Sequence, residues 1–490
     1  MKIKELKSGT DIRGVASDIC GNKVNLTDDV LVRLSNAYAI WISKYTGVPV
    51  HKLKIAVGND SRITSESISI TVISTLAQAG ITVYDCGLSS TPAMFMTMVD
   101  TKIHGAIQIT ASHHPCDRNG LKFFTRDSGI SGEQLDEIIS ISESNRAPVS
   151  APGGIVEFDY MRTYCARLRK MICDGLGKKE SDLPLKGYKI VVDAGNGAGG
   201  FYANDVLKPL GADIEGSRYL EPDGMFPNHI PNPENKEAME SICEAVITSG
   251  ADLGIIFDTD VDRAGCVDSS GKEINRNRLV ALASMLALEG HEGGTIVTDS
   301  VTSDGLKEFI ETNLGGVHYR YKRGYRNVID KAIELCNQGI DCPLAIETSG
   351  HAAFKENYFL DDGAYLVTKI VIMLASGVDI NRALESMKMP AESVEKRFVI
   401  LDENFRDYGM YVLDELKKFA EENENLTLAD DNREGIRAYN SDGWFLLRLS
   451  VHDPIMPLNI ESNSVGGCDK LAKILKPFLA KFDKLNTSSL

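Results

Sequence analysis

Apolar runs that end in small or polar loops recur along the first three quarters of the chain. Three of them begin alike, at Lys54–Asp60, Lys189–Asn196 and Thr295–Ser303. The first two are each followed by a helical pattern, at 68–79 and 202–210, and then by a further strand pattern, at 81–86 and 213–215. Alternating strand and helix predicts α/β structure with mainly parallel sheet. The recurrence of the pattern predicts three such domains in tandem.

The pattern changes after about residue 390. Alternating strand patterns at 396–401 and 443–451 and an amphipathic helix near 468–485 predict a smaller α+β domain. The weakest element signals lie near 147–154, 269–272 and 389–392. We therefore expect domains at residues 1–150, 151–270, 271–390 and 391–490.

Composition narrows the class of protein. The formal charge of −16 argues against nucleic acid or an anionic membrane as the main partner. The longest apolar run, Leu279–Leu288, is too short to span a membrane, and the N-terminus lacks the apolar core of a signal peptide. We expect a soluble, cytoplasmic protein. Its ten cysteines contain no C-x-x-C pair, which argues against a thiolate zinc site.

The segment Thr110–Pro115, followed by Asn119–Lys122, carries the strongest chemical signal. It comes directly after the apolar run Ile103–Ile109. The loops at the carboxyl edge of an α/β sheet are where such folds bind ligands. Ser112 there could carry a covalent phosphoryl group, stabilised by cations and backbone N–H groups at a helix start. A polar turn with an N-cap serine explains the segment alone about equally well.

A second signal follows the strand pattern that ends at Phe257. Asp258, Asp260 and Asp262 stand at alternate positions and suit a hard cation such as Mg²⁺, while Arg263 could hold a phosphate. An acidic surface turn is a poor alternative, because three close carboxylates repel one another. A second alternative is a haloacid-dehalogenase-type phosphatase with Asp258 as nucleophile, although that motif usually opens a domain and here closes one.

Other candidates are weaker when taken alone. The turn at Gly195–Gly200 matches a dinucleotide-binding pattern, but polar side chains within it disfavour a nicotinamide site. The loop Glu347–His351 offers a carboxylate, a hydroxyl and an imidazole suited to sugar hydroxyls. The cations at 322–326 include Arg326, and Arg448, Ser450 and His452 in the last domain could bind a dianion.

Together these segments resemble the α-D-phosphohexomutase superfamily, in particular its phosphomannomutase/phosphoglucomutase and phosphoglucosamine mutase branches. The motifs that carry the resemblance occur in order along most of the chain. They are Gly9–Gly14, Val57–Arg62, the Ser112 loop, Val192–Gly197, Pro222–Gly224 with Pro227–Asn228 and Pro231–Glu234, Asp258–Arg263 and Glu347–His351.

The resemblance implies three α/β domains with mixed sheets and a smaller C-terminal α+β domain around a central cleft. It implies conversion of hexose 1-phosphate to hexose 6-phosphate through a phosphoserine and a 1,6-bisphosphate, which also activates the enzyme. The implied roles are a phosphoserine at Ser112, Mg²⁺ held by Ser112 and Asp258, Asp260 and Asp262, and phosphate binding or proton transfer by Arg13, Lys122 and Arg263. Glu347 and Ser349 would bind the sugar hydroxyls, with His351 nearby. The final domain, with Arg448, Ser450 and His452, would bind the phosphate that is not transferred, and Arg326 is a further substrate-binding candidate.

The last loop departs from the superfamily pattern R-x-S-G/N-T-x-P with a later arginine. Arg448 and Ser450 match it, but Val451, His452 and Pro457 replace the expected residues. This departure keeps a non-catalytic sugar-phosphate-binding protein open as a third function. Lys122 is the first candidate for the proton transfer and His351 the second. The motifs leave glucose, mannose and glucosamine phosphates open as substrates, and they do not indicate an oligomeric state.

Overall fold

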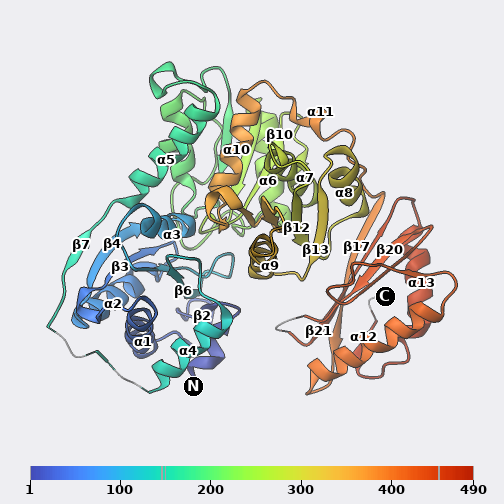
Figure 1. Ribbon diagram of the computed structural model, residues 1–490, viewed down its shortest axis with the longest axis horizontal. Helices are drawn as coiled ribbons and strands as arrows, with labels where there is room; N and C mark the ends of the chain where they lie inside the picture. The colour runs from blue at the N-terminus through green and yellow to red at the C-terminus, as the bar shows by residue number, and fades with distance from the viewer. Residues whose placement is uncertain (1, 145–146, 149–150, 451–452, 489) are drawn as a thin grey trace. The chain divides into compact units, whose positions relative to one another are not determined.

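The computed structural model describes residues 2–144, 147–148, 151–450, 453–488 and 490. The chain forms two compact units, each described here by itself (Figure 1). Unit 1 contains residues 1–275 and 349–381, and unit 2 contains residues 276–348 and 382–490.

The N-terminal part of unit 1 is built on a seven-stranded mixed sheet. The sheet order is β1 (Lys7–Ser8), β2 (Asp11–Val15), β6 (Arg118–Thr125), β5 (Gly105–Ile109), β3 (Lys54–Asn59), β4 (Thr82–Leu88) and β7 (Ile155–Glu157). β5, β3, β4 and β7 are mutually parallel, whereas β6 runs antiparallel to β5. The loop between β5 and β6 therefore leaves the sheet at the carboxyl end of β5, and Ser112 lies in this loop.

Helices cover this sheet because their apolar positions fall on one face. They are α1 (Asp28–Thr46), α2 (Ser65–Gln78), α3 (Thr91–Asp100) and α4 (Gly132–Glu143). Figure 1 shows α1, α2 and α4 close together, and α1 contacts both of the others. Leu34 of α1 and Ile55 and Ile107 of the strands are fully buried in one apolar core. Burying aliphatic side chains of this size stabilises the fold by about 1.5–3 kcal/mol each.

A four-stranded sheet forms the second part of unit 1, in the order β11 (Glu273–Ile274), β10 (Ala264–Asp268), β9 (Leu253–Phe257) and β8 (Ile190–Asp193). β8 and β9 are parallel, and β10 returns antiparallel to β9. Its helices are α5 (Tyr160–Gly175), α6 (Lys236–Ser249) and α10 (Gly363–Ala375). The strands β15 (Ala352–Phe354) and β16 (Leu360–Asp361) pair antiparallel in the same unit.

The patterns at 202–210 and 213–215 did not give the expected regular helix and strand. Tyr202–Leu207 forms a π-helix and Lys208–Leu210 a short 3₁₀ helix. Pro209 lacks a backbone N–H, and Gly211 turns the chain into the left-handed region at φ 92°, so the helix ends here. Among the described residues, Asp213 forms only an isolated bridge with Lys189.

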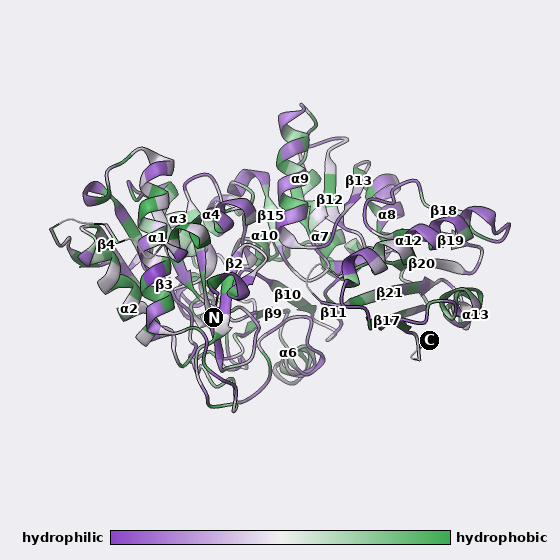
Figure 2. Ribbon diagram, turned by 90° about the horizontal axis from the view of Figure 1, so that it is seen from below, coloured by the Kyte–Doolittle hydropathy of each residue, from purple (hydrophilic) through white to green (hydrophobic). Residues whose placement is uncertain are grey.

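Unit 2 contains the third α/β region and the C-terminal region. In the former, β12 (Thr295–Asp299) lies between β13 (Val317–Tyr321) and β14 (Leu344–Ile346), all parallel, and α9 (Tyr325–Asn337) packs on β12 and β14. Figure 2 shows both hydrophilic and hydrophobic residues along α9, as expected of a helix with one buried face. The remaining helices of this region are α7 (Asn277–Leu288) and α8 (Asp304–Glu308).

The C-terminal region is an antiparallel sheet covered by α12 (Phe405–Glu422) and α13 (Gly467–Leu479). The sheet order is β18 (Thr427–Leu428), β19 (Ile436–Asn440), β20 (Gly443–Leu447), β21 (Ile455–Ser462), β17 (Glu392–Ile400) and β22 (Leu485–Asn486). The predicted fold class, three α/β domains and a smaller α+β domain, is confirmed. In the part of the chain that the structure describes, every helix is too short or too polar to cross a membrane.

Candidate active site

Ser112 lies in a turn between β5 and β6. The prediction that a helix begins here was wrong, because residues 111–117 form turns. Ser112 itself has φ 50°, a left-handed conformation that costs energy in a residue other than glycine. Its side chain is buried, donates to Asp258 Oδ2 at 3.0 Å and accepts from Arg263 Nη2 at 3.1 Å. The hydroxyl therefore lies between a carboxylate and a guanidinium.

The three aspartates follow β9 in one buried loop. One carboxylate oxygen of each of Asp258, Asp260 and Asp262 lies within 4.8 Å of the others. Lys122 on β6 balances part of this charge, because its Nζ lies 2.8 Å from Asp260 Oδ2 and 2.5 Å from Asp262 Oδ2. Thr91, at the start of α3, donates its hydroxyl to Asp260 as well. Side chains of β6 and α3 thus contact the aspartates of the loop that follows β9.

The aspartate loop has the donor set and the charge that a divalent cation requires. Asp260 Oδ1 and Asp262 Oδ1 are buried and have no hydrogen-bond partner among the described residues. Burial and the charge of Asp262 raise the pKa of Asp258 well above its usual value. Buried oxygen atoms without partners are costly unless a cation or water satisfies them. An all-oxygen set of this kind fits a hard ion such as Mg²⁺.

Arg263 connects the aspartates with the serine loop. Its Nε and Nη2 lie 3.1 Å from Asp258 Oδ2, and Nη2 also donates to His113 Nδ1 at 2.6 Å. A ring nitrogen that accepts from a guanidinium carries no proton. Consistently, burial and the Arg263 charge lower the pKa of His113 to about 2. His113 is therefore a neutral residue that orients Arg263, and it adds no positive charge to the site.

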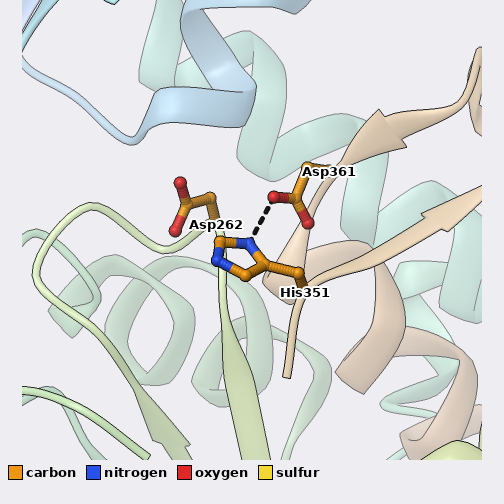
Figure 3. Close-up of side chains that lie close together, drawn as sticks. All are labelled: Asp262, His351 and Asp361. Atoms are coloured by element: carbon orange, nitrogen blue, oxygen red, sulfur yellow. Dashed lines mark hydrogen bonds and ion pairs between the residues drawn. The ribbon is translucent and has the colours of Figure 1, made fainter. Parts of the chain in front are cut away.

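His351 approaches the aspartates from the loop before β15. It forms a bridge with Arg263, and the adjacent Ala264 N–H donates to Gly350 O at 3.4 Å. Figure 3 shows its ring between Asp262 and Asp361, with Nδ1–H donating to Asp361. Burial opposes protonation, but the charges of Asp361 and Asp262 outweigh it and raise the pKa of His351 to about 9. The outer carboxylate thus fixes the tautomer and orientation of the imidazole.

Arg13 lies on β2, which pairs with β6 so that Arg13 is opposite Gly120. Its Nη2 forms an ion pair with the buried Asp11 at 2.8 Å. After the effect of burial, the Arg13 charge is the next contribution that lowers the pKa of His114, to about 3. Arg13 therefore places a positive charge near the serine loop, and its ion pair with Asp11 holds that charge in position.

The glycine turn after β8 packs against the aspartate loop, which accounts for its glycines without a dinucleotide. A Cβ on Gly197 would lie 2.7 Å from Thr259 O, and one on Gly200 would lie 2.1 Å from Leu220 O. The Asp193 carboxylate caps the turn by accepting from Gly195 N–H at 2.9 Å. Protein atoms thus occupy the space into which a pyrophosphate would have to fit. The turn positions Thr259, and with it the aspartates on either side.

In unit 2, Glu347 is the first residue of the loop after β14. Its Oε1 accepts from Gly324 N–H at 2.5 Å, and the next residue, Thr348, donates to Asp299 at 2.6 Å. Arg326, on α9, forms an ion pair with Asp330 at 2.8 Å. Ser349 is buried and belongs to unit 1. The structure thus fixes the carboxylate of the loop through the backbone of the neighbouring cationic segment.

The final loop presents a buried cation. Arg448 is 9% exposed, its Nε has no partner among the residues that the structure describes, and its pKa is lowered by burial. Ser450 accepts from Asp453 N–H at 3.3 Å. Val451 and His452 lie outside the described residues. Pro457, which replaces the expected arginine, accepts from Arg448 N–H through its carbonyl at 3.1 Å.

Sequence reasoning assigned no role to several residues that organise the site. They are Asp60, Arg62, Thr91, His113 and Asp361. Asp60, Arg62 and His113 belong to segments that the sequence singled out, but their partners are distant in sequence. Asp361 follows His351 by ten residues, and only the antiparallel pairing of β15 and β16 brings the two together.

The fold is that of the α-D-phosphohexomutase superfamily. Three profiles described as phosphoglucomutase/phosphomannomutase α/β/α domains I, II and III match residues 5–148, 163–271 and 275–389. The chain belongs to the phosphoglucomutase/phosphomannomutase family and is an isomerase of that type.

Similar proteins agree with this assignment. A phosphomannomutase/phosphoglucomutase of Pseudomonas putida is 28% identical over 461 residues, 91% of this chain and 92% of the relative. The crystal structure of a phosphoglucomutase/phosphomannomutase family protein from Burkholderia thailandensis has a TM-score of 0.82 at 25% identity and covers 98% of both chains. At 12% identity and a TM-score of 0.50, the fold is also that of an Aspergillus fumigatus N-acetylphosphoglucosamine mutase in complex with GlcNAc-6P and magnesium, over 80% of this chain and 91% of that one.

Proposed function

We propose that this protein interconverts hexose 1-phosphate and hexose 6-phosphate by lending a phosphoryl group from Ser112. The observation that carries the proposal is the buried Ser112 hydroxyl held between Asp258 and Arg263. A buried serine with these two partners can hold a phosphate ester whose negative charge is compensated by fixed cations. The same cations serve both half-reactions, because a loose phosphoryl transition state mainly needs charge neutralisation and in-line positioning.

In the first half-reaction, the phosphorus–oxygen bond to Ser112 breaks as the free hydroxyl of the sugar phosphate attacks phosphorus. The product is a hexose 1,6-bisphosphate, and the same bisphosphate supplied from solution would phosphorylate and thereby activate the enzyme. In the second half-reaction, the other phosphate of this intermediate returns to the Ser112 oxygen. Arg263 is placed to hold the transferred phosphoryl oxygens, since its Nη2 lies 3.1 Å from the serine oxygen.

The aspartate loop would hold Mg²⁺ through Asp258, Asp260, Asp262 and an oxygen of the seryl phosphate. Bound there, the ion would act as a Lewis acid on the phosphoryl oxygens. Lys122 already compensates Asp260 and Asp262, and it would keep the loop in place through both half-reactions.

His351 is the proton carrier that the geometry supports best. Its pKa of about 9 keeps the imidazole mostly protonated near pH 7, so its neutral fraction, oriented by Asp361, would take the proton of the attacking hydroxyl and return it in the reverse step. Lys122, the first candidate on sequence grounds, is bound to two aspartates, which stabilises its charged form. We assign Lys122 to charge compensation and Arg13 to phosphate binding.

We assign recognition of the sugar phosphate to the loop after β14, to α9 and to the final loop. Glu347 and Ser349 would bind vicinal hydroxyls, and Arg326, Arg448, Ser450 and His452 would bind the phosphate that is not transferred. Glucose, mannose and glucosamine phosphates are the candidate substrates.

The test uses the full-length protein with Mg²⁺ and hexose 1,6-bisphosphate. Intact-mass analysis should show one added phosphoryl group, and Ser112→Ala should lose it together with at least about 1,000-fold of the mutase rate, because no other group can lend the phosphate. Ser67→Ala, which alters an exposed serine of α2, should retain both properties. Assays of the three sugar phosphates side by side identify the preferred substrate, and chelation followed by Mg²⁺ addition tests the metal.

Two other results would point to the alternative functions. A phosphate on Asp258 with release of inorganic phosphate would indicate a phosphatase. Binding of sugar phosphate without turnover would indicate a sensor. Either result contradicts the mutase proposal.

A further inference from the structure

One arginine binds the backbone of the loop that contains Ser112. Arg62 follows β3, is 2% exposed, and directs its two terminal nitrogens at backbone carbonyl groups of this loop. The acceptors are Pro115 O at 2.7 Å and Arg118 O at 2.9 Å from Nη1, His114 O at 2.6 Å from Nη2, and the carbonyl of Ser112 itself, also from Nη2. A single guanidinium thus binds four carbonyl groups within seven residues of the loop.

Asp60 fixes the position of this guanidinium. Its Oδ2 lies 3.2 Å from Arg62 Nε, and its Oδ1 accepts from Arg62 N–H at 3.0 Å and from the Ser65 hydroxyl at 2.7 Å. Asp60 also accepts from the Thr110 hydroxyl at 2.7 Å, and Thr110 Oγ1 in turn accepts from Ser112 N–H at 2.9 Å. The Asp60–Arg62 pair therefore holds Ser112 from both its N–H and its carbonyl side.

A loop of the second α/β region covers the pair. The ring of Phe226 lies 5.2 Å from the Arg62 guanidinium carbon. Gly224 approaches the same turn so closely that a Cβ would lie 2.2 Å from Ile63 N and 2.5 Å from Ser61 O. Two sequence motifs without an assigned role, Val57–Arg62 and Pro222–Gly224, thus meet at one buried charge.

The conformation of Ser112 explains why the contacts of Arg62 with this loop matter. At φ 50°, a serine adopts a backbone geometry that persists only when its surroundings impose it. This geometry directs Oγ toward Asp258 and Arg263, while the carbonyl points the other way into the guanidinium. In the described part of the chain, the Oγ partners are Asp258, Arg263 and His113, so Arg62 acts on the reacting atom through the backbone.

We infer that Arg62 is a positioning residue that holds the phosphate-carrying oxygen of Ser112 in line for transfer. The inference rests on the proposed phosphoserine function. Displacing a reacting atom by about 1 Å can slow a reaction about 100-fold without changing substrate binding. Arg62 should therefore control the rate of transfer and not the affinity for sugar phosphate.

The test is Arg62→Lys, which keeps a positive charge near Asp60 but supplies one nitrogen in place of three. The matched control is Arg33→Lys, because Arg33 of α1 also donates to a backbone carbonyl, that of Ser142 at 3.0 Å, far along the chain from Ser112. Each protein is phosphorylated with hexose 1,6-bisphosphate, and rapid quenching then measures transfer to hexose phosphate and loss to water. Thermal unfolding reports the stability of each variant.

For Arg62→Lys we expect transfer and kcat to fall about 100-fold, with KM changed less than about 3-fold. Loss of phosphate to water needs no such alignment, so the fraction of phosphate lost per turnover should rise. Arg33→Lys should transfer at the wild-type rate. A stability defect alone would lower Tm without changing the rate of transfer per folded molecule.

Asp60→Asn provides a second variant if Arg62→Lys does not fold. It removes the charge that orients Nε and should reduce transfer about 10-fold in the same direction. Wild-type transfer in folded Arg62→Lys, or in Asp60→Asn, would overturn the inference while leaving the phosphoserine function intact. Failure of the wild type and Arg33→Lys to take up phosphate would instead overturn the proposed function and, with it, this inference.

Discussion

The Ser112 site of unit 1 differs in its balance of charge from the cluster of Arg320, Arg437, Asp304 and Asp431 in unit 2. In unit 1 the carboxylates Asp258, Asp260 and Asp262 outnumber the two cations, Lys122 and Arg263, that pair with them. Unit 2 instead concentrates arginines between its two regions. Arg320 and Arg437 share Asp304, and Arg320 also pairs with Asp431.

A carboxylate of the chain also occupies the neighbourhood of Arg448. Glu434 accepts from the Ser300 hydroxyl and, at 3.1 Å, from Arg323 N–H, and its charge acts on Arg448. An excess of carboxylates suits a cation, whereas a buried arginine suits a phosphate dianion. Under the proposed function, the aspartate loop of unit 1 would serve the phosphoryl transfer and Arg448 of unit 2 would bind a phosphate of the substrate. The departures of the sequence from the family pattern, at Val451, His452 and Pro457, fall within the residues of unit 2.

The largest expected effect that sharpens this comparison comes from Asp361→Asn in unit 1. Loss of the carboxylate that fixes the His351 tautomer should lower kcat about 10- to 100-fold with little change in KM. Steady-state kinetics with sugar phosphate measures both. Asp341→Asn, which alters an exposed Asp–His pair with His291 at 2.7 Å, is the matched control and should retain activity. An unchanged kcat for Asp361→Asn would remove His351 from the proton transfer.

An intermediate effect is expected in unit 2 from Arg448→Gln. If Arg448 binds a phosphate as proposed, removing its charge should raise KM for sugar phosphate about 10-fold, because a charge-assisted hydrogen bond contributes about 1.5–3 kcal/mol. The value of kcat should stay within about 3-fold, since the reacting atoms lie elsewhere. Lys470→Gln on the exposed face of α13 is the control. A fall in kcat with constant KM would contradict the assignment of Arg448 to substrate binding.

The smallest expected effect concerns stability rather than turnover. Burial, opposed by Arg437, raises the pKa of Glu461 from 4.5 to about 7. The folded state therefore binds this proton more tightly than the unfolded state, so the contribution of Glu461 is present below pH 4.5 and is lost as the pH rises through 7.

Glu461→Gln stays neutral and should be more stable than the wild type at pH 8, by at most about 2–3 kcal/mol, with the difference shrinking toward pH 5. Thermal unfolding across this pH range, at constant ionic strength, measures the difference. Parallel pH profiles for the two proteins would show that Glu461 does not control the stability of unit 2.

Much of the fold could be predicted from apolar periodicity. The runs at 54–60, 103–109 and 295–303 each contain a buried strand, because a fully buried strand of a parallel sheet needs apolar residues on both faces. The segment 202–210 has the same apolar character as a regular helix, yet Pro209 and Gly211 interrupt it and it winds as a π-helix. Periodicity alone does not distinguish these two windings.

The residues at the centre of the candidate site could also be selected from the sequence. Ser112 and the three aspartates stand out because polar residues directly after a buried strand require an explanation. The supporting contacts were not visible. Arg62 and Ser112 are fifty residues apart, and their contact depends on the pairing of β3 with β5. Whether a polar residue in a loop faces solvent or clamps another loop is decided by tertiary packing.

The burial of Ser112, only 3% exposed, has a consequence for regulation in the cell. Kinases and phosphatases must draw a peptide segment into their own clefts, and a side chain enclosed by Asp258 and Arg263 cannot be offered in that way. If Ser112 carries the proposed phosphate, a molecule as small as a sugar bisphosphate would install it, and a sugar or water would remove it. The phosphorylation state of this enzyme would then follow the supply of its own metabolites and would be independent of signalling enzymes.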